Sequence, residues 1–311
     1  MHFQHIKTIL HPFETIGKIV DSYSCKLEAT LMKMRFEQKA TQLANATINS
    51  DKAGVTEDRF CQNETIVSLT SYGRRIYDVF LAIESIMQGT QKPNRIILWL
   101  SEKEFKNFKL PISLQNQKKR GLEIRYCEDI LSYKKLIPTL KEFPEATIIT
   151  IDDDAIYGFD FVENLIISHT SNPSCIFANR VHRITKNADE NLKSYLDWEW
   201  SVSTPSKNDH DLFFTGVGGV LYPPHSLDEE VFNKKIFMEI CPTADDVWFN
   251  AMARLKGTRI NKSFTHVANG EDYILNEAAQ DCALSLINNS TENSSNDIQI
   301  KAVFEKYKIK I

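Results

Sequence analysis

Hydrophobic positions near the start of the chain recur every three or four residues, which is the period of an amphipathic helix. The first such stretch extends from Ile6 to Val20, and Pro12 is expected to break or kink it. A second helix is predicted at roughly 24–45, followed by a polar linker. Residues 1–60 are therefore interpreted as a helical extension. It either packs on the main domain as a hairpin or serves as a homodimerisation or membrane-surface element.

From residue 63 the pattern changes to short apolar runs that alternate with amphipathic stretches. The apolar runs predict strands at 65–72, 95–101, 121–127, 146–152 and 174–182, and the amphipathic stretches predict helices at 76–88, 132–143, 159–170 and 244–256. This alternation predicts an α/β, Rossmann-like domain over residues 61–275, with a mainly parallel sheet flanked by helices. Residues 276–311 are expected to form a polar C-terminal tail.

Composition and charge limit the classes of function. The 311 residues are 42% apolar and 25% charged, which is ordinary for a globular protein. The net charge is −4, so no basic surplus suggests a nucleic-acid partner. No apolar run reaches the roughly 18 residues of a membrane-spanning helix, and the N-terminus lacks the apolar region of a signal peptide. We therefore expect a cytoplasmic protein with free cysteine thiols. The basic run at 118–120 is expected to form a solvated turn.

The strand predicted at 146–152 ends in three successive aspartates, Asp152, Asp153 and Asp154. In open parallel sheets, ligands bind at the carboxyl ends of the strands. Adjacent buried carboxylates repel one another unless a cation compensates them. A hard divalent cation with oxygen ligands would do so and would in turn hold a diphosphate. The alternative is a solvated acidic turn or a helix N-cap. An apolar strand that leads directly into three aspartates favours the metal site.

Two pairs of basic residues stand where helices are predicted to begin. Arg74 and Arg75 follow the first strand, and Lys134 and Lys135 begin the helix at 132–143. A cation is unfavourable near a helix N-terminus unless an anion lies there. This placement favours phosphate binding over simple surface charge, and Lys135 is the preferred residue of its pair.

The chain contains four segments in a definite order: TIVSLTSYGRRI, IDDDAIY, GVGGVLYPP and ADDVWF. Together they resemble bacterial glycosyltransferases of the GT-A fold, specifically the family 2-like enzymes of capsule and lipopolysaccharide assembly. The resemblance covers about residues 63–270. It implies a GT-A catalytic domain that uses Mn²⁺ or Mg²⁺ to move a sugar from a nucleotide-diphosphate sugar to a surface-polysaccharide acceptor, either a glycan or a lipid-linked glycan. It also implies action at the cytoplasmic face of the plasma membrane.

The resemblance assigns roles to individual residues. Asp152 and Asp154 match the outer positions of the DxD motif, with Asp154 the expected direct metal ligand. His266 is a candidate third ligand, although a lone histidine is usually structural. The other residues expected at the nucleotide or donor sugar are Thr70, Ser71, Tyr72, Arg74, Arg75, Asp129, Lys134, Lys135, Asp153, Arg180, Gly218 and Gly219.

The resemblance also assigns the acidic pair Asp245 and Asp246 to the acceptor side. One of them would serve as catalytic base, and Asp246 is the better match, although the family commonly has Glu-Asp here. An acceptor hydroxyl must lose its proton as it attacks, and a positioned carboxylate can accept it. Ordinary capping of the helix at 244–256 is the alternative, although Thr243 can already do this.

Three other functions remain open. A retaining transferase of the same fold would use the acidic pair only structurally, and a scaffold subunit of a polysaccharide assembly complex would be catalytically silent. A sugar nucleotidyltransferase is disfavoured, because the loop after the first strand has one glycine where that class has several. Trp198 and Trp200 offer apolar faces that can stack on a sugar ring or fill the core.

Overall fold

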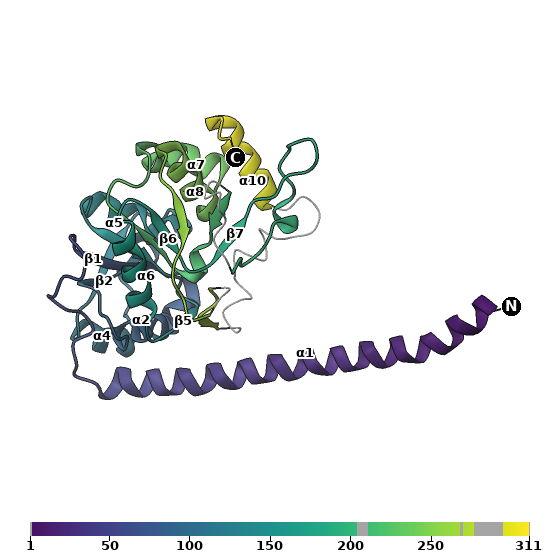
Figure 1. Ribbon diagram of the computed structural model, residues 1–311. Coiled ribbons are helices and arrows are strands. Elements are labelled where there is room, and N and C mark those ends of the chain that lie inside the picture. The colour runs from purple at the N-terminus through teal and green to yellow at the C-terminus, as the bar shows by residue number, and fades with distance from the viewer. Residues whose placement is uncertain (1, 204–210, 268–269, 277–294, 311) are drawn as a thin grey trace. The chain divides into compact units, whose positions relative to one another are not determined.

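The computed structural model describes residues 2–203, 211–267, 270–276 and 295–310, and for residues 2–22 and 25 it describes the backbone alone. The chain divides into two compact units, Met1–Gln42 and Leu43–Ile311. The second unit contains the sheets and all helices after the first (Figure 1).

A seven-stranded sheet with the order β10-β6-β9-β4-β1-β2-β3 forms the centre of the second unit. Its strands are β1 (Thr65–Thr70), β2 (Arg95–Ser101), β3 (Leu122–Cys127), β4 (Thr147–Thr150), β6 (Ile176–Ala178), β9 (Val220–Tyr222) and β10 (Ile260–Lys262). β9 runs antiparallel to both of its neighbours, β4 and β6, whereas the other pairs in this sheet are parallel. The expected α/β architecture with a mainly parallel sheet is therefore confirmed.

Two smaller antiparallel sheets and a set of helices complete the unit. The small sheets pair β5 (Ala155–Tyr157) with β11 (Tyr273–Leu275) and β7 (Val181–Arg183) with β8 (Leu212–Phe214). The α-helices are α2 (Val79–Met87), α3 (Glu102–Phe105), α4 (Ile112–Lys118), α5 (Ile137–Glu142), α6 (Phe161–Ser171), α7 (Lys234–Ile240), α8 (Asp245–Lys256) and α10 (Ser295–Tyr307). The 3₁₀ helices are η1 (Gly73–Tyr77), η2 (Leu131–Lys135), η3 (Tyr195–Asp197), η4 (Gly216–Gly218) and η5 (Glu229–Phe232).

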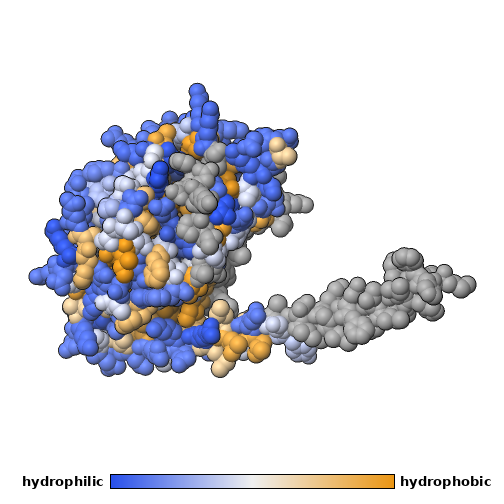
Figure 2. Space-filling view, in the orientation of Figure 1, coloured by the Kyte–Doolittle hydropathy of each residue, from blue (hydrophilic) through white to orange (hydrophobic). Residues whose placement is uncertain are grey.

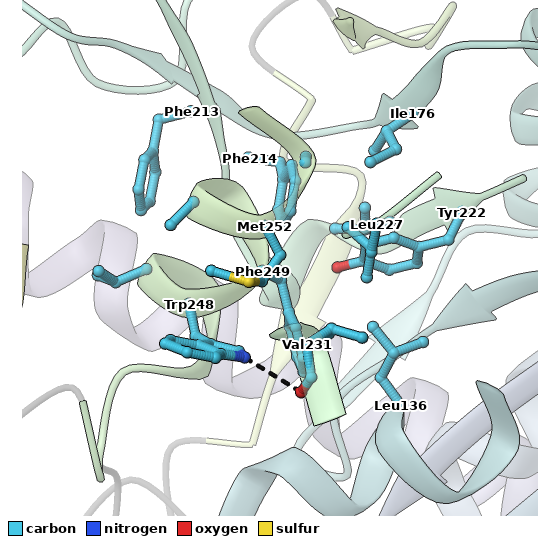
Figure 3. Close-up of a cluster of buried hydrophobic side chains, with 14 of the residues drawn as sticks. Leu136, Ile176, Phe213, Phe214, Tyr222, Leu227, Val231, Trp248, Phe249 and Met252 are labelled. Atoms are coloured by element: carbon cyan, nitrogen blue, oxygen red, sulfur yellow. Dashed lines mark hydrogen bonds between the residues drawn. The ribbon is translucent and has the colours of Figure 1, made fainter. Parts of the chain in front are cut away.

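Strands β1, β2, β4, β6 and β9 of the central sheet are buried on both faces, as their continuous apolar runs predict. Along β1, Ile66 belongs to one hydrophobic core and Val67 to the other, because successive side chains of a strand point to opposite faces. Residues of α2, α4 and α6 line the core that contains Val67, and residues of α5, α7, α8 and α10 pack at the other. Figure 3 shows this second core around α8, where the indole of Trp248 donates a hydrogen bond to the Val231 carbonyl at 3.3 Å.

The first helix, α1 (His2–Asn49), is a single helix of 48 residues. The expected division into two helices is therefore wrong, and of the break or kink expected at Pro12 the break does not occur. An interior proline removes one backbone hydrogen bond, and the helix continues past it (Figure 1). Leu27 and Met34 are exposed on this helix, and the coloured part of the helix carries apolar surface in Figure 2. Dimerisation or membrane contact through this region stays a prediction. None of the helices in the described ranges combines the length and apolar character of a membrane span.

The boundaries of the second unit differ from those expected at residues 61 and 275. Leu43 is already buried, and the Thr47 hydroxyl donates to Glu84 Oε2 at 3.1 Å, so the end of α1 belongs to this unit. At the other end, α10 packs on α8 and buries Ile300 and Val303, so the C-terminal region contributes to the core. Residues 277–294 of the predicted tail lie outside the described residues.

Arg120 corrects the expectation of a solvated basic turn at 118–120. Its guanidinium is buried and lies 2.8 Å from Glu84 Oε2, and the exposed fractions of the two side chains are 3% and 0%. Gln117 Nε2 also donates to Glu84, at 3.0 Å, whereas Lys118 and Lys119 are exposed as expected. Glu84 therefore joins α2 to α4 and, through Thr47, to the end of α1.

Replacing Glu84 by Gln would leave the Arg120 charge buried without its counter-ion. We expect the free energy of unfolding to fall by about 3–5 kcal/mol, the usual result of breaking one side of a buried ion pair. Urea unfolding followed by circular dichroism measures it. Glu305→Gln is the control, because Glu305 forms an exposed pair with Lys301 at 3.9 Å and should change stability by less than about 1 kcal/mol. Equal effects of the two substitutions would contradict this account.

Candidate active site

The three aspartates, here called the acidic turn, connect β4 to β5 at the carboxyl end of β4. Asp153 is buried, and its Oδ2 accepts a hydrogen bond from Ser71 Oγ at 2.6 Å. Arg75 Nη1 lies 2.8 Å from Asp153 Oδ1 and 3.1 Å from Asp154 Oδ2. Burial raises the pKa of Asp153 to about 6, although Arg75 opposes the rise. Asp153 therefore anchors the turn to β1 and η1.

The first-strand residues expected at the nucleotide have different surroundings. Thr70 donates its hydroxyl to the Trp99 carbonyl at 2.8 Å and so ties β1 to β2. Arg75 is buried under the acidic turn, with its guanidinium 5.2 Å from the centre of the Tyr72 ring, whereas Arg74 is exposed. Arg75 is thus a counter-ion of the aspartates. Burial lowers its pKa, but Asp153 and its neighbour raise it above the ordinary value overall.

Lys135 connects the acidic turn to the acidic pair. Its buried Nζ lies 2.9 Å from Asp152 Oδ1 and 3.0 Å from Asp245 Oδ2. Burial disfavours the charged ammonium, but Asp152, Asp245 and Asp246 raise the pKa of Lys135 well above its ordinary value. Lys135 is therefore protonated, and it brings the end of β4 and the start of α8 into one site.

Lys134 and Asp129 form a second ion pair at the end of β3. Burial opposes the charge of Asp129, but the hydrogen bond from Lys134 lowers the pKa of the carboxyl overall. Both lysines lie in the last turn of η2, directly before the N-cap of α5, rather than in a first helical turn as predicted. Their carboxylate partners, rather than a helix end, explain why these ammonium groups are buried.

Asp246 has the properties of a proton acceptor. Its side chain is half-buried, and its Oδ2 accepts a hydrogen bond from the Gly216 backbone N–H at 2.9 Å. Its Oδ1 is enclosed and has no hydrogen-bond partner among the described residues. Burial and the neighbouring Asp245 raise the pKa of Asp246 to about 7, against the opposing charge of Lys135. The N-cap of α8 is Ala244, so Asp246 does not cap its own helix.

Two residues that the sequence analysis missed hold this arrangement. Asn250 exchanges hydrogen bonds with the backbone of Phe214, at 2.9 and 3.1 Å, and donates to the Asp246 carbonyl at 2.8 Å. The Tyr157 hydroxyl accepts from the Asp152 N–H at 2.9 Å and donates to the Val217 carbonyl at 3.1 Å. The available signals were the four-residue spacing of Asn250 from Asp246 on one helix face, and the tyrosine that ends IDDDAIY.

The glycines of segment 216–219 lie close to other side chains, and Gly216 lies against the ion pairs. A Cβ at Gly216 would lie 2.6 Å from Lys135 Nζ and 2.9 Å from Asp246 Oδ1. Gly219 has φ +84°, and a Cβ there would meet the Phe161 ring at 2.3 Å. A Cβ at Gly218 would likewise meet the Arg180 side chain at 2.5 Å. These glycines were expected to admit a sugar, but in the structure their close neighbours are the protein's own side chains.

Arg180 and His266 lie against other partners. Arg180 Nε is 3.0 Å from Ser201 Oγ and 3.3 Å from Glu271 Oε1. His266 Nε2 is 2.8 Å from Asp160 Oδ2 at the start of α6. Asp160 is not one of the expected metal ligands, so this contact does not support His266 as the third ligand.

Asp152 and Asp154 offer carboxylate oxygens, the ligand type that a divalent cation binds together with phosphate oxygens. The described residues contain no group of three or more His, Cys, Asp or Glu side chains placed to hold a metal ion. Mg²⁺, however, is usually held by one or two carboxylates together with substrate phosphates. The side chains of Asp152 and Asp154 remain 29% and 11% exposed. With all groups ionised, the five carboxylates of the turn and pair exceed the two cations, Arg75 and Lys135, by three charges.

No protein-family model matches this chain, and no curated protein matches it either. Its function is therefore inferred from the residues of the site themselves.

The raised pKa of Asp246 predicts how stability depends on pH. Because the folded pKa of about 7 lies above the ordinary value of 3.8, the folded chain binds more protons between these values, and its stability falls as pH rises through this range. Asp246→Asn removes this half-buried charge. At pH 8 we expect the variant to be more stable than the native chain by roughly 2–4 kcal/mol, with the difference shrinking towards pH 5.

Urea unfolding at pH 5 and pH 8 measures this difference directly. Asp153 titrates in both proteins, so its contribution cancels in the comparison. A variant that is less stable than the native chain at both pH values would show that the carboxylate stabilises the fold, as a capping residue does.

Proposed function

We propose that this chain is a metal-dependent glycosyltransferase of the GT-A fold that moves a sugar from a nucleotide-diphosphate sugar to a surface-polysaccharide acceptor. The observation that carries the proposal is the Lys135 bridge between Asp152 and Asp245, at 2.9 and 3.0 Å. Two acidic motifs far apart in the sequence meet at one buried ammonium. Bringing several carboxylates and an ammonium together in the interior lowers stability, and such clusters of ionisable groups are typical of functional sites.

The order of strands in the central sheet supports a binding site for the nucleotide-sugar donor on the β1 side of the acidic turn. Parallel neighbours β4, β1, β2 and β3 end at the same edge of the sheet, so Ser71 and the Asp129–Lys134 pair lie along this edge from the turn. Asp152 and Asp154 would hold Mn²⁺ or Mg²⁺, which when bound supplies positive charge to a departing diphosphate. The nucleotide would then extend over the ends of β1 to β3.

Asp246 supplies the base for a single displacement. The acceptor hydroxyl oxygen attacks the anomeric carbon and forms a new C–O bond, while the bond from that carbon to the diphosphate oxygen breaks. The nucleoside diphosphate leaves with the electron pair, and the hydroxyl proton passes to the Asp246 carboxylate. A pKa of about 7 suits this role, because a general base works best when its pKa is close to the working pH. One displacement inverts the configuration at the anomeric carbon.

Asp246→Asn tests the base directly. The amide keeps the size of the side chain and can still accept the Gly216 hydrogen bond, but it cannot take up a proton. We expect donor binding to persist while transfer falls by roughly 10²- to 10⁴-fold. Asp245→Asn is the matched control and should reduce transfer less, because Asp245 acts through its contact with Lys135. Turnover, nucleotide affinity and melting temperature are measured on both variants, and NMR identifies the anomeric configuration of the product.

Three results would contradict the proposal. Near-normal transfer by Asp246→Asn would exclude Asp246 as the base. A product that keeps the configuration of the donor would indicate a retaining transferase. Donor binding without transfer by the native chain, over a range of acceptors, would favour a scaffold.

A further inference from the structure

We propose that Trp200 is a stacking platform for a carbohydrate ring, and that the ring it receives is the acceptor of the transfer. The assignment to the acceptor rests on the proposed function, whereas carbohydrate stacking on Trp200 does not. The proposal combines three features: an exposed and rigidly held indole, polar groups beside it, and its position relative to Asp246.

Trp200 differs from the other tryptophans in its exposure. It is 39% exposed, whereas Trp198 is 4% exposed and belongs to the core beside Phe213. Trp99 and Trp248 are fully buried. A single exposed apolar side chain is ordinary on a protein surface, so the assignment depends on how Trp200 is held and on what lies beside it.

The indole of Trp200 is held in place by a neighbouring ring and by a backbone hydrogen bond. Its ring stacks on His182, with centroids 4.7 Å apart and planes 27° from parallel, and its Nε1 donates to the Tyr195 carbonyl at 3.2 Å. His182 is itself buried, and its Nδ1 accepts from the Ser201 N–H at 3.0 Å. Burial lowers the pKa of His182 to about 3, so the stacked imidazole is neutral in the physiological range. Because the stacking and the hydrogen bond already hold the indole in place, binding a sugar on it would cost little side-chain entropy.

Polar groups suited to sugar hydroxyls surround the indole. The Arg180 guanidinium lies over the Trp200 ring, 5.6 Å from its centre, and also contacts Glu271. Ser201 Oγ donates to Glu271 Oε1 at 2.7 Å. A pyranose ring presents C–H groups on one face, which suit the electron-rich face of an indole, and hydroxyls at its edge, which suit charged donors and acceptors.

Backbone connections place this platform next to the base. The Thr215 N–H donates to the Arg180 carbonyl at 3.2 Å, and the next residue, Gly216, donates to Asp246 Oδ2 at 2.9 Å.

The strand order of the central sheet indicates that Trp200 lies on the acceptor side of the site. Arg180 follows β6, and in the sheet β9 and β6 lie on the opposite side of β4 from β1, β2 and β3. The donor nucleotide is assigned to the ends of β1 to β3. A sugar on Trp200 would therefore approach Asp246 from the other side, as an acceptor hydroxyl must.

NMR of the native chain tests the stacking. The four indole N–H signals are recorded while methyl glucoside, methyl galactoside and methyl N-acetylglucosaminide are added at millimolar concentration, and Trp200→Phe assigns the Trp200 signal. We expect at least one glycoside to shift that signal to saturation, and Trp200→Ala to weaken its binding at least about 10-fold. Phe232→Ala is the matched control, because Phe232 is 37% exposed and lies against Lys141 of α5, which leads to the opposite end of β4.

Donor binding is followed in the same variants by the rise in melting temperature with nucleotide sugars and Mn²⁺. Trp200→Ala should leave that rise unchanged. Failure of every glycoside to shift the Trp200 signal would overturn the proposal, as would stronger shifts with uridine or guanosine or an equal loss of binding in Phe232→Ala. If glycosides bind at Trp200 but no nucleotide sugar binds the native chain, the proposed function and the acceptor role fail while the carbohydrate platform stands.

Discussion

The pairing of the buried Lys135 ammonium with two carboxylates is the interaction on which the rest of the site depends. A charge enclosed in protein costs several kcal/mol unless opposite charges compensate it. Here the compensation comes from Asp152 at the end of β4 and from Asp245 at the start of α8, both within 3.0 Å. Strand, helix and η2 therefore cannot shift independently. The glycine segment completes the enclosure, since a Cβ at Gly216 would collide with the ammonium.

Lys135 and Arg75 carry fewer charges than the five carboxylates of the turn and pair, and this imbalance costs stability. Burial raises the pKa of Asp153 to about 6 and that of Asp246 to about 7. Carboxylates whose pKa lies near neutral pH are common at functional sites, and under the proposed function they suit a bound cation and a proton released by the acceptor. The fold tolerates them because the surrounding elements are well packed, above all α8 with Trp248, Phe249 and Met252 in the core.

Local patterns in the sequence predicted the elements, but not the partners of buried charges. The apolar runs located β1 to β4, and the start of α8 was predicted within one residue. This works because the buried face of a strand or helix places apolar residues at regular intervals in the sequence. Lys135 and Arg120 were interpreted from their near neighbours as helix-start and surface charges. Their actual partners lie far away in the sequence, and no short-range pattern identifies such pairs. Trp200 could not be separated from Trp198 for the same reason, since exposure is decided by the fold.

The central claim is that the acidic turn binds a nucleotide-diphosphate sugar together with a metal ion. The most direct measurement is a thermal-shift screen of nucleotide sugars, with and without Mn²⁺, on the native chain and on Asp154→Ala. The account predicts that at least one nucleotide sugar raises the melting temperature by roughly 5–10 °C at 100 times its Kd, only with Mn²⁺ and only in the native chain. A chain that no nucleotide sugar stabilises, or an Asp154→Ala variant stabilised as strongly as the native chain, would contradict it.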